Sequence, residues 1–197
     1  MQKEIDIYIE PPQIKSEVQR PEFYIVSRQK FVILYLTTYG AYTVYWFYKN
    51  WACYKHKYRR TIHPVGRAIF SIFFVHELFN IVDARLKASD IAFQWFPGKF
   101  ATIFIISRII DNDTLGEIIG EFLVPLGVFS ISLTLFLIRF FILLRAQEAI
   151  NFSQHDPLGE RNSELTGTNY FWIIVGLLLF WSLPILLLLT NLGLISL

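Results

Sequence analysis

The chain is poor in the residues on which many enzymes and metalloproteins depend. Its one cysteine, Cys53, can form neither an internal disulfide framework nor a thiolate metal cage. The four histidines show no metal-ligand spacing such as H-E-x-x-H; they are His56, His63, His76 and His155. The sequence also contains no phosphate-binding glycine loop, dinucleotide fingerprint or G-x-S-x-G motif. We therefore expect no cofactor, no metal and no catalytic residues, and we interpret the protein as a non-enzyme.

Charged residues are also scarce. Only 17% of the 197 residues are charged, whereas roughly a quarter are charged in an average soluble domain. Hydrophobic residues make up 54% of the chain and aromatic residues 17%. This apolar excess is larger than one water-soluble core is expected to hold, so the composition favours an integral membrane protein. The net charge of +2 does not discriminate between classes.

Long uncharged runs predict where the chain crosses the bilayer. Residues 170–190 are uncharged and long enough for a helix across a hydrocarbon core about 30 Å thick. Residues 122–144 and 31–48 are further candidates, and either 68–82 or 100–110 supplies one more. The prediction is an all-α polytopic membrane protein with about four transmembrane helices plus one amphipathic or short helix. A re-entrant loop that breaks at Gly40 is the alternative for residues 31–48.

The distribution of charge predicts the orientation and the domains. Residues 49–67 carry lysines and arginines without an acid, and residues 111–121 carry acids without a base. Because basic loops favour the cytoplasmic side, the first segment is expected inside and the second outside. Residues 1–30 form a polar N-terminal tail, and residues 31–197 form an integral membrane helical domain. Within the tail, residues 4–10 alternate like a half-buried strand that either pairs with a partner protein or stays disordered.

A basic cluster directly follows an aromatic stretch. The aromatic residues expected at the membrane interface are Tyr45, Trp46, Tyr48 and Trp51, because such rings favour that depth. The basic residues are Lys55, Lys57, Arg59 and Arg60. They are candidate contacts for anionic lipid headgroups, at about 1 kcal/mol per base. The alternative is an ordinary topology signal. Nucleic acid is not an expected partner, since no recognised binding motif surrounds these residues.

Polar residues interrupt the apolar segment 68–82. His76, Asn80 and Asp83 are spaced by four and three residues, so they share one face of a helix. If this helix spans the membrane, the polar stripe is a candidate pathway for protons or a cation. If the helix lies in the membrane interface, the same stripe faces water.

Three short motifs resemble those of uncharacterised small polytopic bacterial inner-membrane proteins, which often read T-L-G-x-Y-x-x-Y-W-F-Y-K-N-W. The first motif matches at Tyr45, Trp46, Phe47, Tyr48, Lys49, Asn50 and Trp51. The second matches at Pro64, Arg67, Ala68 and Phe70, and the third at Gln147, Ala149, Asn151, Asn162 and Asn169. The resemblance covers about residue 31 to the end, although Thr38-Tyr39-Gly40 replaces T-L-G. It implies a multi-pass protein of the bacterial inner (cytoplasmic) membrane, and it implies no activity.

Two functions remain open. The first is a non-catalytic scaffold or partner-organising subunit, which binds membrane lipids and either a partner protein or further copies of itself. It rests on the tail, the basic cluster and the missing catalytic motifs. The second is an oligomeric small channel or transporter that uses the polar stripe of helix 68–87.

Overall fold

The computed structural model describes residues 21–110, 125–182 and 189, with the backbone alone for residues 125–130. The described residues form helices and no β-strands. The elements are α1 (Arg28–Thr37), α2 (Tyr42–Tyr58), α3 (Pro64–Ile69), α4 (Ser71–Ala88), α5 (Pro97–Ile110), α7 (Pro125–Ser153), the 3-10 turn η1 (Glu160–Asn162), α8 (Gly167–Gly176) and the π-helical turn η2 (Leu177–Trp181).

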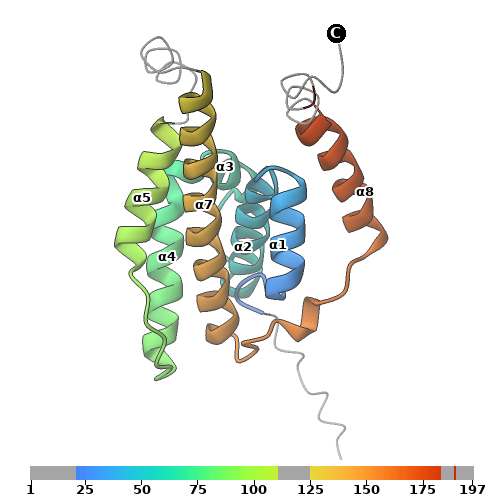
Figure 1. Cartoon of the computed structure of the whole chain (residues 1–197). Helices are drawn as coiled ribbons and strands as arrows, with labels where there is room; N and C mark the ends of the chain where they lie inside the picture. The colour runs from blue at the N-terminus through green and yellow to red at the C-terminus, as the bar shows by residue number, and fades with distance from the viewer. Residues whose placement is uncertain (1–20, 111–124, 183–188, 190–197) are drawn as a thin grey trace, which may run out of the picture.

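Helix α7 lies at the centre of a helical bundle. It packs against α1, α4 and α5, whereas α8 stands to one side and contacts α1 (Figure 1). Fully buried aromatic side chains from α1 and α2 fill the middle of the bundle, among them Phe31, Trp46 and Trp51. Burying each of these large side chains contributes about 1.5–3 kcal/mol or more, so the aromatic residues of this sequence stabilise an intramolecular core.

The predicted span at residues 31–48 is two helices rather than one. Thr38 to Ala41 form a turn between α1 and α2, in which Tyr39 and Gly40 have φ angles of 51° and 80°. Glycine tolerates such a left-handed conformation. A Cβ atom at Gly40 would also lie 3.3 Å from the Tyr35 hydroxyl. The chain therefore breaks at the glycine that the alternative interpretation singled out.

Three of the other predicted spans are also divided or displaced, whereas segment 170–190 lies in α8 and η2 up to residue 181, and its residues 183–188 and 190 are outside the described residues. Segment 68–82 breaks at Phe70, where α3 ends and α4 begins. Segment 100–110 belongs to α5, whose 14 residues rise only about 21 Å, short of a hydrocarbon core of about 30 Å. The long helix α7 contains most of segment 122–144, but it buries Arg139, Gln147 and Asn151 inside the protein.

The prediction of a polytopic membrane protein is wrong for the part of the chain that the structure describes. None of the described helices combines the length and the apolar character that a bilayer crossing requires. The assignment to a bacterial inner membrane loses its basis with the predicted spans. The physical reason is that the apolar runs are interrupted at Gly40 and Phe70, and much of their aromatic content packs inside the bundle.

Residues 22–30, the described end of the predicted N-terminal tail, pack against the helices. Residues 22–27 precede α1 and belong to no helix, and Phe23 and Val26 are fully buried. Ser27 caps α1, since its hydroxyl accepts a hydrogen bond from the Lys30 amide at 3.3 Å. The packed part of the chain thus begins before the predicted domain boundary at residue 30. The predicted strand at residues 4–10 and the acidic segment 111–121 lie outside the described residues.

Candidate functional site

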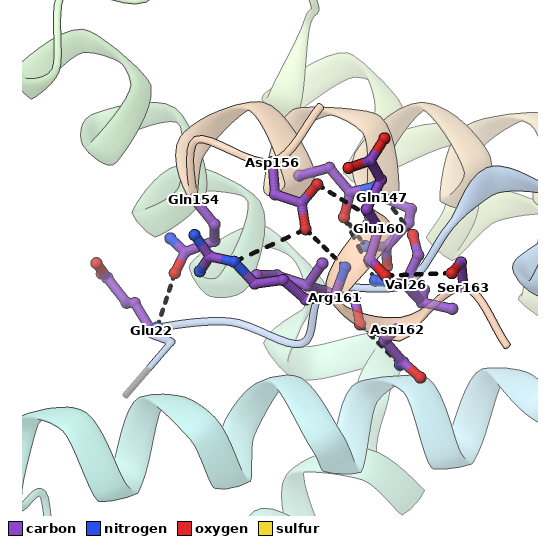
Figure 2. A network of polar contacts seen from close by, with 11 residues as sticks. Glu22, Val26, Gln147, Gln154, Asp156, Glu160, Arg161, Asn162 and Ser163 are labelled. Carbon is purple, nitrogen blue, oxygen red and sulfur yellow. Dashed lines mark hydrogen bonds and ion pairs between the residues drawn. The ribbon is translucent and has the colours of Figure 1, made fainter. Parts of the chain in front are cut away.

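Five amide side chains bind the main chain of segment 22–27; we call them the amide cluster, and they are Asn50, Gln147, Asn151, Gln154 and Asn162. Asn151 binds both main-chain groups of Val26, donating to its carbonyl at 2.9 Å and accepting from its N–H at 3.4 Å. The other four each bind one main-chain group of Glu22, Tyr24 or Ile25. Part of this network is drawn in Figure 2. The cluster recognises main chain rather than side chains, because carboxamides match both peptide donors and acceptors.

The first residue of the segment is held by three elements. The Glu22 carboxylate lies 3.2 Å from the Arg85 guanidinium of α4, and its own amide donates to Gln154 at 2.8 Å. Tyr58, at the end of α2, lies near the same carboxylate. Partial desolvation and the interaction with Glu22 raise the pKa of Tyr58 to about 12. The segment is therefore attached to α2, α4 and α7 at once.

The connection between α7 and α8 is attached to the same segment. Asp156 accepts hydrogen bonds from the amides of Glu160 and Arg161 at 3.0 and 3.1 Å, which forms the tight turn shown in Figure 2. The Lys30 ammonium, buried at 3% exposure, donates to the Asn162 side chain and to the Glu164 carbonyl, both at 2.6 Å. Desolvation lowers the pKa of Lys30. These contacts fix the point from which α8 starts.

Helix α8 begins with a capping box and is attached again near its end. Thr166 and Asn169 exchange hydrogen bonds at its first turn. At its last turn, Gly176 packs so closely on α1 that a Cβ atom would lie 2.6 Å from the Thr37 carbonyl oxygen. The Trp181 indole then donates to the Leu36 carbonyl at 3.0 Å. Helix α8 is thus attached at both ends.

Between these two attachments lies an apolar groove of about 610 Å³. Figure 1 shows α8 separated from α1 and α2 along this stretch. The side chains that line it are apolar or phenolic for the most part and include Val44, Tyr45, Tyr48, Ile69, Trp172 and Leu179. These six are all at least 38% exposed. Exposed apolar surface gathered in a concave site marks a place for ligand or partner binding.

The four predicted lipid-contact residues lie at and just beyond the end of α2. Lys55 is half-buried, and Lys57, Arg59 and Arg60 are exposed. No carboxylate in the described ranges forms an ion pair with any of the four. Arg59 ends the helix in the left-handed conformation, with φ 50°. The four cations therefore remain open to solvent and to an external anion.

The aromatic residues predicted at a membrane interface divide into two pairs. Trp46 and Trp51 are fully buried, and the Arg67 guanidinium lies 4.4 Å from the centre of the Trp51 ring. Tyr45 and Tyr48 are exposed and line the groove. Since Trp46 donates its indole N–H to Gln147, residues from the first and third motifs meet in space. The same holds for Trp51 and Arg67, which come from the first and second motifs.

The predicted polar stripe lies on the side of α4 that faces α5 and solvent. His76 lies 3.3 Å from the Thr102 hydroxyl, and Asn80 is exposed. Asp83 accepts a hydrogen bond from the Trp95 indole at 3.0 Å and pairs with Lys87 at 2.7 Å. No hydrogen bond joins His76 to Asp83 within the described part of the chain, so each residue has its own local partner there.

Sequence reasoning missed the groove itself. Trp172 and Gly176 fell inside a predicted span, and Val44, Val65 and Ile69 were not singled out. One signal was present, because Tyr42, Tyr45 and Tyr48 repeat every third residue and indicate one face of a helix. Among the described residues, no three histidine, cysteine or acidic side chains are grouped to hold a metal. Comparisons of this chain with protein-family models, with curated proteins and with solved structures give no match.

Proposed function

We propose that this chain is a non-catalytic binding protein, and that the groove between α8 and helices α1, α2 and α3 takes the hydrocarbon part of a small amphiphile such as a lipid. The observation that carries the proposal is the apolar groove of about 610 Å³, whose walls are apolar and exposed. Holding a lipid without transforming it is one form of the scaffold role expected from the sequence.

The size of the groove favours a small ligand over a helix of a partner protein. Pockets for small molecules usually measure about 300–1,000 Å³, a range that includes this groove. A helix with its side chains is about 10–12 Å across, so about one turn would fill the same volume. One turn buries too little apolar surface for stable docking, whereas a single hydrocarbon chain needs no more than a site of this volume.

The lining also argues against catalysis. None of the residues that line the groove is an acid, a lysine, an arginine, a histidine or a cysteine. Its phenols include Tyr42 and Tyr45, and burial raises the pKa of both. General acid–base catalysis works best when the pKa lies near the working pH, so these neutral phenols are poor candidates. They can still donate hydrogen bonds that orient a bound ligand.

A pair of exposed apolar residues provides the test. Ile69 of α3 is 62% exposed and lines the groove, whereas Phe73, four residues later in α4, is 76% exposed and does not line it. Binding of a fluorescent long-chain amphiphile to the purified full chain is measured for Ile69→Gln and Phe73→Gln. We expect Ile69→Gln to weaken binding about fivefold, since burying part of an isoleucine contributes about 1 kcal/mol. Phe73→Gln should leave the affinity unchanged.

Two results would count against this function. One is a wild-type chain that does not bind the amphiphile below the concentration at which the amphiphile aggregates by itself. The other is an equal loss of binding in Ile69→Gln and Phe73→Gln, which would indicate general adhesion to exposed apolar side chains. Circular dichroism of both variants checks that the helices are retained.

A further inference from the structure

The wall that α2 gives to the groove continues into a lysine on the same helix face. Val44, Tyr45 and Tyr48 line the groove. Lys55 follows Tyr48 by seven residues, which is two helical turns within about 20°, so the two side chains share one face. The rise of an α-helix separates them by about 10 Å along the axis. The apolar wall therefore ends in a cation.

The neighbouring lysine points the other way. Lys57 follows Tyr48 by nine residues, or two and a half turns, which places it on the opposite face of α2. Both lysines lie in the last turn of the helix, and neither forms an ion pair with a carboxylate in the described ranges. They thus carry the same charge in the same turn, and they differ in whether they face the groove.

We propose that the groove selects an amphiphile with an anionic head group, its hydrocarbon chain between α8 and α2 and its head against Lys55. This inference rests on the proposed function and specifies its ligand class. The supporting observation is charge complementarity: the face that lines the groove ends in Lys55, and Arg59 follows one turn later at the end of the helix. Lys57 adds to the positive potential without facing the groove.

The C-terminal end of a helix repels an anion, and this repulsion acts against the cations of α2. The helix dipole places about half a negative charge at the last turn of α2. Lys55, Lys57, Arg59 and Arg60 place four positive charges in and just after the same turn. The cations outweigh the dipole, so the net potential at this end of the groove attracts an anion.

The test compares matched amphiphiles and matched lysines. Two single-chain amphiphiles of equal chain length, one with a phosphate head and one with an uncharged head, are titrated into the full chain at low and at physiological salt. We expect tighter binding of the phosphate form, and a smaller advantage at higher salt because exposed charges are screened over about 8 Å. Lys55→Gln should weaken binding of the phosphate form about fivefold and leave the uncharged form unchanged. Lys57→Gln should change neither.

Other results would contradict either the head-group site or the proposed function as a whole. Equal affinity for both amphiphiles, or equal effects of Lys55→Gln and Lys57→Gln, would remove the head-group site and leave the apolar groove in place. If neither amphiphile binds, the proposed function falls as well. A third arm uses inorganic phosphate as competitor: if it displaces the phosphate-headed form at equal concentration, the site binds free anions and the amphiphile proposal is wrong.

Discussion

The amide cluster and the groove differ in how far their polar and apolar groups find partners within the described residues. In the amide cluster, Asn151 and its neighbours pair the main chain of residues 22–27, while Phe23 and Val26 are fully buried. In the groove, apolar side chains such as Trp172 and Leu179 are 54% and 67% exposed. The polar groups of the amide cluster find their hydrogen-bond partners within the chain. The groove has an apolar surface that the described residues leave uncovered.

This difference separates stability from binding. A buried polar group that loses its hydrogen-bond partner costs about 1–3 kcal/mol, so the amide cluster contributes to the stability of the fold. An exposed apolar surface contributes little to folding, but it gains free energy when a ligand covers it. Substitutions in the cluster should therefore lower stability, and substitutions in the groove should lower ligand affinity.

The largest expected effect comes from Gly159→Ala in the turn beside the amide cluster. Gly159 has φ 68°, and a Cβ atom there would lie 2.6 Å from the main chain of Val26 and Ser27. Left-handed strain and this close contact together should reduce the free energy of unfolding by about 3 kcal/mol, measured by urea denaturation. Gly98→Ala is the control, because nothing lies within 4 Å of its Cβ position and alanine favours helix. Equal behaviour of the two variants would contradict the tight packing of segment 22–27.

A smaller effect on stability, and a larger one on binding, is expected from Gly176→Ala. Its Cβ atom would lie 2.6 Å from the Thr37 carbonyl oxygen, so α8 must move away from α1 and the groove changes shape. We expect amphiphile affinity to fall at least fivefold, while urea denaturation shifts by about 1 kcal/mol or less because α8 contacts little of the core. Gly167→Ala, in the same helix with nothing within 4 Å, should preserve both properties. Loss of stability without loss of affinity in Gly176→Ala would contradict the assignment of this contact to ligand binding rather than to stability.

The smallest effect is a pH dependence at the start of segment 22–27. The pKa of Tyr58 is raised to about 12, chiefly by partial desolvation and then by the interaction with Glu22, whereas its ordinary value is 10.0. The folded protein thus holds this proton more tightly than the unfolded chain does. Its contribution to stability is present below pH 10 and is lost as the pH rises from 10 to about 12. The loss of stability over this interval, measured by urea denaturation at a series of pH values, should be shallower in Tyr58→Phe than in the wild type; equal slopes would contradict this contribution.

The helices were more predictable than their arrangement. Apolar runs indicated helical segments at 100–110 and 122–144, and these fall within or largely within α5 and α7. The break at Gly40 was an open alternative because glycine is the residue that adopts positive φ at least cost. The membrane prediction failed because composition counts apolar residues without showing what they touch. Here Trp46, Trp51 and Phe31 are fully buried in one shared core.

The candidate site was beyond sequence reasoning for a different reason. Gln147, Asn151 and Asn162 were noted as members of a motif, but a motif does not reveal that the amides bind a segment more than a hundred residues away. The groove depends on where α8 lies, and that position follows from Gly176 against Thr37 and from Lys30 against Glu164. Such long-range contacts leave no periodic signal.

The central claim, that the groove takes a hydrocarbon chain, is tested most directly by mapping a photoreactive amphiphile on the full chain. An amphiphile with a diazirine in its hydrocarbon chain is bound, irradiated and located by peptide mass spectrometry, with unlabelled amphiphile as competitor. The account predicts competable labels on the groove walls, namely residues 41–48, 65–69 and 168–180. Labels that gather instead on exposed apolar residues outside the groove, such as Phe73 of α4 or Phe96 before α5, would contradict it.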